Sequence, residues 1–176
     1  MTDSMVETFE KARPRLWGVA YRMLGSVADS EDAIQDTFIK WQKADRGKIK
    51  NPEAWLVSVC TRRAIDILRA AKAARVDYVG VWLPEPVHAE ETYNLNNPEA
   101  ASDLAASLTT AFLVVLENLS PVERAAYLLR EVFDYSYADI AAILDKSEAA
   151  CRQVVSRAKK RVHKGDIDTG PRDDHQ

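Results

Sequence analysis

The sequence is poor in the residues that mark secreted and membrane proteins. Its 176 residues include only two cysteines and six glycines. Two cysteines are too few for a disulfide scaffold or a structural zinc site. No apolar run approaches the ~20 residues that a membrane span needs, and the amino terminus lacks the layout of a signal peptide. These absences exclude collagen-like, disulfide-stabilised and membrane-inserted proteins, so we expect a cytoplasmic protein.

Groups that enzymes use for catalysis are also scarce. The three histidines are His88, His163 and His175. None of them is spaced from a cysteine or carboxylate as the ligands of a metal site or the members of a catalytic triad are. Cys60 and Cys151 fall on the apolar sides of predicted helices, which favours packing over reactivity. No glycine-rich phosphate loop occurs. We therefore expect no enzyme activity, no cofactor and no bound metal.

Helical periodicity dominates what is present, and no stretch alternates as a strand would. Ser120, Pro121 and Glu123 match the capping box of a helix, and Asn51 with Pro52 begins another. Gly25 is placed to end the first helix, and Asp29 or Ser30 to cap the second. The helices that we expect cover residues 9–24, 30–41, 52–75, 104–119, 121–133, 137–144 and 147–162.

Charge is distributed unevenly along the chain. Residues 1–75 hold 14 basic and 10 acidic side chains, residues 76–108 hold six acids and no base, and residues 109–165 hold nine bases and seven acids. Basic stripes at 62–75 and 152–164 suggest two contacts with a polyanion, although a solvated helix face would account for either stripe alone.

The acidic stretch separates two helical segments. Prolines, asparagines and Gly80 break any helix there, which is typical of a linker. We predict an all-α fold of two small helical domains, 5–75 and 104–164, joined by a flexible acidic linker at 76–103 and followed by a disordered tail at 165–176.

The second domain ends in a pattern typical of helix-turn-helix proteins, since only Asp145 and Lys146 separate helices 137–144 and 147–162. Arginine and glutamine can read base edges in the major groove, while lysine and serine hold phosphates. A generic amphipathic helix is the alternative. The side opposite its apolar stripe carries Ala149, Arg152, Gln153, Ser156, Arg157 and Lys160.

In the first domain, a basic loop at 43–50 precedes a helix with polar residues on one side. A cationic groove of this kind suits single-stranded DNA, but a solvated surface would explain it equally well. The polar side comprises Ser58, Thr61, Arg62, Ile65, Asp66 and Arg69.

The helix before that loop has an acidic outer side at Glu31, Asp32, Gln35 and Asp36, which is unsuited to DNA. Acids in a first helical turn favour the helix dipole, which accounts for Glu31 and Asp32 without a function. A basic protein partner would suit Gln35 and Asp36.

Three runs resemble bacterial extracytoplasmic-function (ECF) sigma factors. Residues 30–41 (SEDAIQDTFIKW) resemble the region 2 helix that docks on the β′ clamp helices of RNA polymerase, and 54–69 resembles the −10 promoter helix. Residues 119–158 resemble region 4, which reads the −35 element and meets the β flap. The resemblance implies core RNA polymerase, promoter DNA and an anti-sigma factor as partners.

The resemblance implies three sets of site residues. Those for polymerase are Glu31, Asp32, Gln35, Asp36, Phe38 and Trp41. Those for −10 DNA are Lys48, Lys50, Asn51, Trp55, Ser58, Thr61, Arg62, Asp66 and Arg69. Those for −35 DNA are Ser147, Ala149, Ala150, Arg152, Gln153, Ser156, Arg157 and Lys160. Arg63 departs from the residues usual at its position, and we assign it no role.

Residues 78–86 (YVGVWLPEP), 131–135 and 149–153 are similar to a subgroup that carries a SnoaL-like domain after region 4. About 12 residues follow Lys164, against at least ~50 for a domain, so we expect that domain to be absent. The sequence thus predicts a sigma factor that directs promoter-specific initiation. A stand-alone helix-turn-helix regulator and a small nuclease or hydrolase are the alternatives.

Overall fold

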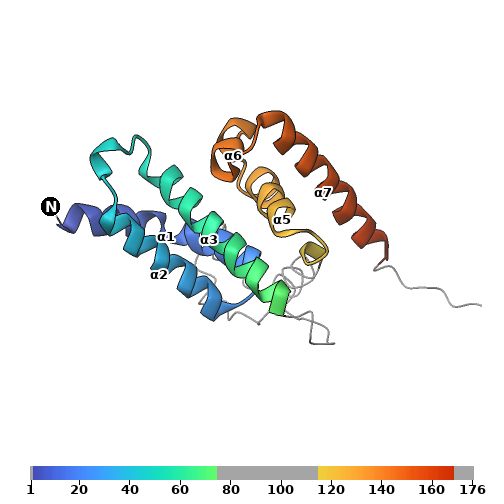
Figure 1. The fold of residues 1–176 in the computed structure, drawn as a ribbon, viewed down its shortest axis with the longest axis horizontal. Coiled ribbons are helices and arrows are strands. Elements are labelled where there is room, and N and C mark those ends of the chain that lie inside the picture. Colours follow the sequence, from blue (N-terminus) through green and yellow to red (C-terminus); the bar gives the residue numbers. More distant parts are fainter. Residues whose placement is uncertain (1, 75–114, 169–176) are drawn as a thin grey trace, which may run out of the picture.

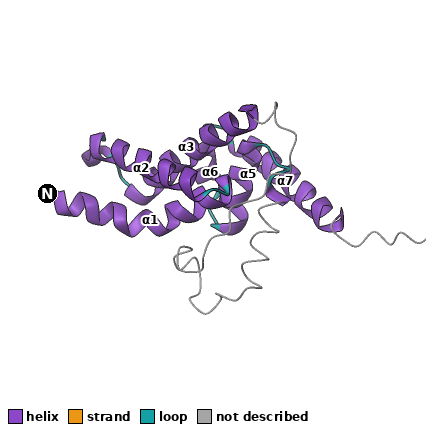
Figure 2. Ribbon diagram, turned by 90° about the horizontal axis from the view of Figure 1, so that it is seen from below, coloured by secondary structure: helices purple, strands orange, loops and turns teal. Residues whose placement is uncertain are grey.

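The structure, a computed structural model, describes residues 2–74 and 115–168. The first unit consists of α1 (Thr2–Leu24), α2 (Val27–Lys43) and α3 (Pro52–Ala74), with a 3₁₀ turn at Arg46–Lys48. The second consists of α5 (Pro121–Tyr127), the π-helical segment Leu128–Val132, α6 (Tyr137–Leu144) and α7 (Glu148–Asp168). These two ranges contain no strand, which confirms the predicted all-α fold (Figure 2).

Several boundaries differ from the predicted ones. The first helix begins at Thr2, and α7 continues through Asp168, beyond the predicted domain end at 164. The predicted linker at 76–103 and most of the predicted helix 104–119 lie outside the described residues, as does the tail after 168.

The predicted cap of α2 is wrong. Ser26 caps the helix, because its Oγ accepts a hydrogen bond from the Asp29 amide at 3.2 Å. Gly25 ends α1 with a φ of 65°, so the chain turns within two residues and the next helix starts earlier than predicted. Ser30 lies one turn inside α2 and donates to the Ser26 carbonyl. The predicted caps at Asn51 and Ser120 are confirmed.

The core of the first unit forms where α1, α2 and α3 pack together. Leu16, Met23 and Leu56 are fully buried there. Trp41, at the end of α2, is 2% exposed, and its Nε1 donates to the Met5 carbonyl at 3.0 Å. The Trp41 ring also packs on Trp55 of α3, with 5.6 Å between ring centroids. Trp41 of α2 therefore contacts both α1 and α3.

The turn between α6 and α7 is built from short polar residues. Asp145 adopts the left-handed conformation (φ 54°, ψ 50°) that ends α6, and the Lys146 amide donates to the Ala141 carbonyl at 3.0 Å. Ser147 then caps α7 by accepting from the Ala150 amide at 3.1 Å. The predicted helix-turn-helix is thus present, with α6 at its predicted bounds and α7 ending later than predicted.

Glycine adopts the left-handed conformation without steric cost, so Asp145→Gly is expected to raise the free energy of unfolding by about 0.5 kcal/mol. Urea denaturation of the full chain measures the change. Asp145→Ala, which keeps a Cβ and loses the short polar side chain, is the matched control and should not stabilise the protein. Equal effects of the two substitutions would contradict this account of the turn.

The two units form one packed body, in which α3 contacts both α5 and α6 (Figure 1). Arg124 of α5 is 1% exposed, and its guanidinium donates to the Leu116 carbonyl at 3.0 Å and to the Met23 carbonyl of α1 at 2.6 Å. From the first unit, Lys72 of α3 donates to the Leu119 carbonyl at 2.8 Å. We call this packing of α1 and α3 on α5 and α6 the closed arrangement.

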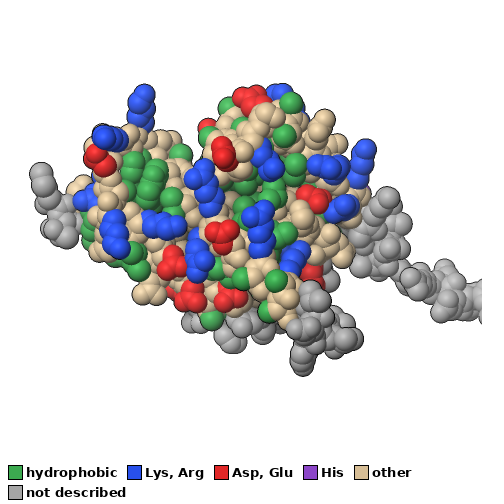
Figure 3. All heavy atoms as spheres, viewed as in Figure 1, with side chains coloured by type: hydrophobic (Ala, Val, Ile, Leu, Met, Phe, Trp, Pro, Cys, Tyr) green, Lys and Arg blue, Asp and Glu red, His purple; other side chains and the backbone are tan. Residues whose placement is uncertain are grey.

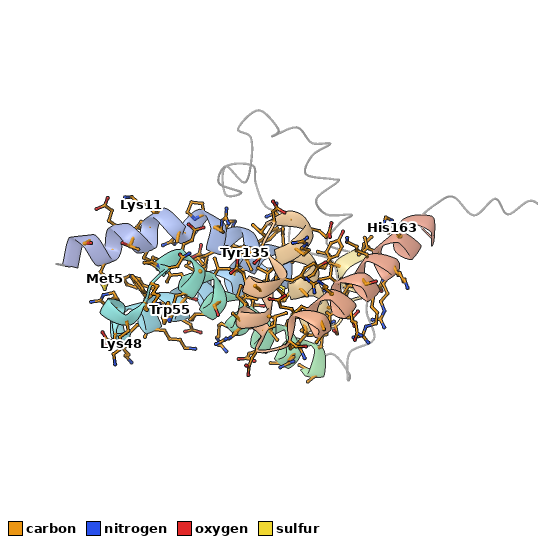
Figure 4. All side chains as sticks on the ribbon, turned by 90° about the horizontal axis from the view of Figure 1, so that it is seen from above. Met5, Lys11, Lys48, Trp55, Tyr135 and His163 are labelled. Atoms are coloured by element: carbon orange, nitrogen blue, oxygen red, sulfur yellow. The ribbon has the colours of Figure 1, made fainter. Side chains whose placement is uncertain are left out.

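Aromatic side chains of the second unit add to the closed arrangement. Arg15 of α1 donates to the hydroxyl of Tyr135 at 3.3 Å, and Arg22 lies over the ring of Phe133 at 5.6 Å from its centroid. Figure 4 shows the labelled Tyr135 in the middle of the molecule, away from both ends. Burial lowers the pKa of Arg22, while the hydrogen bond to Tyr135 raises that of Arg15.

Candidate nucleic-acid interface

The outward side of α7 has the residues that the periodicity predicts. Cys151, Val154, Val155, Ala158 and Val162 are buried against α5 and α6. The predicted polar side is exposed and includes Ala149, Arg152, Gln153, Ser156, Arg157 and Lys160.

An open hollow of about 370 Å³ lies on that polar side, lined by Arg152, Gln153, Ser156 and Arg157. The two guanidinium groups and the amide give it hydrogen-bond donors of the kind that read guanine and adenine edges. Figure 3 shows basic side chains over α7 on the face of the molecule that it draws. A helix with these exposed groups can enter a major groove.

Arg152 has two neighbours that restrict its guanidinium. The Glu148 carboxylate, one turn earlier on α7, lies 3.8 Å from Nη2. The ring of Tyr137, from α6, lies with its centroid 5.1 Å from the Arg152 Cζ. Arg130 lies over the same ring at 4.2 Å. Tyr137 and Arg130 were not predicted from the sequence, because helical periodicity within α7 carries no information about a contact with α6.

A second basic surface surrounds the start of α3. Lys48, Lys50 and Asn51 are exposed there, and Lys48 pairs loosely with Asp45 at 3.6 Å. Figure 4 shows Lys48 and Trp55 near one end of the molecule and His163 of α7 near the other.

Further along α3, Asp66 and Arg69 are exposed, whereas Trp55 and Ser58 are half-buried. The predicted −10 residues therefore lie along most of α3 and do not form a single compact cluster.

Two predicted −10 residues have surroundings that the sequence did not predict: Thr61 is buried, and Arg62 is exposed but hydrogen-bonded to α6. Thr61, expected on the outer side of α3, is 0% exposed. Arg62 donates from Nε to the Ile143 carbonyl at 2.8 Å and from Nη2 to the Ala142 carbonyl at 3.0 Å. The expectation that this side of α3 faces solvent is wrong for Thr61 and Ile65, which are buried, whereas Arg62, Asp66 and Arg69 are exposed as predicted. Arg62 and Lys72 of this helix donate hydrogen bonds to carbonyls of the second unit.

The acidic surface of α2 is present as predicted, although its members have different surroundings. Glu31, Asp32 and Gln35 are exposed, and Glu31 pairs with Arg13 of α1 at 3.5 Å. Figure 3 shows acidic side chains gathered over α2 and basic ones over α3. This surface remains suited to a basic protein partner.

Three other predicted polymerase-binding residues are partly or wholly enclosed. Asp36 is half-buried and pairs with Arg63 of α3 at 2.6 Å, which gives Arg63 a structural role that the sequence analysis left unassigned. Phe38 is half-buried against Phe9, with 4.8 Å between ring centroids. Trp41 belongs to the core, so we leave it out of the contact surface proposed below.

Both cysteines are buried within the described residues. Burial raises the pKa of Cys60 to about 12, so its thiol stays neutral near pH 7 and is a poor nucleophile. No three His, Cys, Asp or Glu side chains within the described ranges lie close enough together to hold a metal ion. No described helix combines the length and the apolar run that crossing a bilayer requires.

The geometry defines a helical protein with a helix-turn-helix unit and a second cationic helical surface. The sigma-70 region 2 family matches residues 8–74, and the sigma-70 region 4 family matches residues 109–162. Relatives with similar sequences are ECF RNA polymerase sigma factors. The chain belongs to the ECF sigma factors of the sigma-70 family.

SigJ of Mycobacterium tuberculosis is 43% identical over 157 residues, which cover 89% of this chain and 49% of SigJ. The probable ECF sigma factor SigI of the same species is 26% identical, covering 94% of this chain and 56% of SigI. The chain thus spans about half the length of these relatives.

Two solved structures share the fold. The crystal structure of SigJ aligns with a TM-score of 0.65 at 39% identity, over 89% of this chain and 52% of SigJ. RpoE of Bartonella quintana, solved with the anti-sigma factor NepR, aligns with a TM-score of 0.66 at 24% identity, over 97% of this chain and 98% of RpoE.

Proposed function

We propose that this chain binds bacterial core RNA polymerase in the cytoplasm and directs promoter-specific initiation by recognising −10 and −35 DNA elements. The observation that carries the proposal is the exposed side of α7, where Arg152, Gln153, Ser156 and Arg157 line one open hollow on a helix-turn-helix unit. The similarity to ECF sigma factors over both matched regions supports the same function.

At the −35 element, α7 enters the major groove of duplex DNA. Arg152 and Gln153, in the first turns of α7, reach base edges, while Ser156, Arg157 and Lys160 contact phosphates. Ser147, Ala149 and Ala150 lie at the amino-terminal end of the helix, where the backbone approaches the DNA most closely.

At the −10 element, the exposed Lys48, Lys50 and Asn51 hold the backbone of an unpaired strand, and Arg69 extends the cationic surface along α3. Arg62 joins them only after it leaves the Ala142 and Ile143 carbonyls of α6. Use of Arg62 at −10 therefore requires these two hydrogen bonds between the units to break.

Polymerase meets the acidic surface of α2. Glu31, Asp32 and Gln35 are exposed and supply charge for a basic partner, and Ile39, 40% exposed, adds an apolar contact beside them. Because two weak DNA contacts held on one polymerase reinforce each other, the free chain should bind promoters poorly. An anti-sigma factor stays a predicted partner.

Run-off transcription with purified core polymerase and a promoter library tests the function. Arg152→Ala should reduce the preference for one −35 base by about 10-fold, because a bidentate base contact supplies discrimination of that order. Lys160→Ala, the matched control, should lower transcription evenly across the library. If the unmodified chain supports no transcription, or binds duplex operators tightly without polymerase, the proposed function is wrong.

A further inference from the structure

The orientation of Arg152 depends on a residue outside the recognition helix. Its side chain is 59% exposed and carries several rotatable bonds, so an unrestrained guanidinium would sample many directions. Two parallel hydrogen bonds to one base require the planar fork to have a defined orientation. Some feature of the structure must therefore restrict this side chain if it reads a base.

Tyr137 is placed to supply this restriction. It is the first residue of α6, and the preceding Ser136 caps the helix by accepting from the Asp139 amide at 3.1 Å, so the backbone under the ring is fixed. The ring is half-buried and has the Arg152 Cζ 5.1 Å from its centroid. An arginine over an aromatic face is attracted by the ring quadrupole.

Arg130 holds the ring in turn. Its guanidinium donates to the Tyr135 carbonyl at 3.1 Å and lies 4.2 Å from the Tyr137 centroid. The Glu148 carboxylate, 3.8 Å from Arg152, acts on the guanidinium from within α7. Arg152 is thus held between a ring that belongs to α6 and a carboxylate that belongs to α7, with the rest of its fork open to the hollow on α7.

We propose that Tyr137 is a specificity-determining positioning residue, which holds the Arg152 guanidinium in the orientation that reads a guanine in the −35 element. Guanine is the base that fits, because its O6 and N7 accept both hydrogen bonds of an arginine fork in the major groove. The proposal rests on the proposed function and adds to it the residue that orients the contact and the base that is contacted.

Tyr137→Leu removes the ring and keeps an apolar side chain, while Tyr137→Phe keeps the ring and is the matched control. In run-off transcription with core polymerase and promoters that vary at each −35 position, Tyr137→Leu should reduce the preference for guanine about 3-fold, at the position where Arg152→Ala acts. Tyr137→Phe should retain the preference. Adding Tyr137→Leu to Arg152→Ala should cause no further loss at that position.

The contact between Tyr137 and Arg152 can also be measured without a promoter. In NMR spectra of the full chain, the Arg152 side-chain protons should show a ring-current shift that Tyr137→Leu removes and Tyr137→Phe retains. Absence of that shift in the unmodified chain overturns the proposal even if transcription is promoter-specific. An even loss of transcription across all promoters in Tyr137→Leu also overturns it, since the role is then structural. If the shift is present but the unmodified chain supports no transcription, the proposed function has failed, and the inference about base reading fails with it.

Discussion

Replacement of Arg124 by methionine is expected to lower the free energy of unfolding by about 3 kcal/mol, the largest stability effect that we expect of any single side chain here. Methionine keeps much of the apolar volume and removes every donor. Arg124 is buried and donates to the Leu116 and Met23 carbonyls, so its loss leaves two buried acceptors without these hydrogen bonds. Each buried acceptor without a donor costs about 1–3 kcal/mol.

Urea denaturation of the full chain measures this loss, and Arg161→Met provides the control. Arg161 pairs with Glu123 at 3.0 Å, and its own side chain is 53% exposed while that of Glu123 is 16% exposed, so its removal should cost about 1 kcal/mol, well below the loss expected for Arg124. Similar losses in the two variants would show that Arg124 does not bridge the units in solution.

Local features of the chain could be predicted from the sequence. The two faces of α7 follow from the 3.6-residue period alone, and the limits of α6 follow from a capping serine and a short polar turn. The side-chain oxygens of Asn51 and Ser120 each accept a hydrogen bond from the amide three residues further along the chain. The local sequence is therefore sufficient to predict these two helix caps. The cap of α2 was mispredicted because the helix was expected to start at Ser30, so that Ser26, which caps it, was not considered.

Contacts between elements could not be predicted in this way. Arg62 is exposed as its place on α3 predicts, but nothing near it in sequence marks its hydrogen bonds to the α6 carbonyls, which lie about 80 residues further along the chain. The periodicity of α3 does not show that this helix also contacts α5 and α6, and it placed the buried Thr61 and Ile65 on the exposed side. Arg63 had no assigned role until its pair with Asp36 was visible.

The candidate site was therefore predicted with unequal success. Where one helix carries the whole site, as α7 does, composition and period were sufficient to place its residues. Around α3 the site combines a loop and a helix on which the second unit packs, so the exposure of its residues depends on tertiary packing. The positioning contact of Tyr137 on Arg152 belongs to this second kind, because it joins α6 to α7.

The closed arrangement is expected to open when the chain binds core polymerase and promoter DNA. Elements at −10 and −35 lie roughly 25 base pairs apart, which is about 85 Å along the duplex at 3.4 Å per base pair. In the closed arrangement Arg62 of α3 is hydrogen-bonded to α6, whose neighbour α7 is the proposed −35 reader. One chain cannot span that distance on DNA while these two helices touch.

Energy transfer between dyes at Ala70→Cys on α3 and Lys146→Cys beside α6 measures the opening. Both positions are exposed, whereas Cys60 and Cys151 are buried, so the dyes should attach to the introduced cysteines alone. Transfer should be high in the free chain and nearly absent in the complex with polymerase and promoter. Arg62→Ala should lower transfer in the free chain, because it removes two hydrogen bonds between the units, whereas Arg69→Ala, an exposed position on the same helix, should not. High transfer in an actively transcribing complex would exclude simultaneous contact of α3 with −10 DNA and of α7 with −35 DNA. The proposal that the two surfaces bind these two elements would then be wrong.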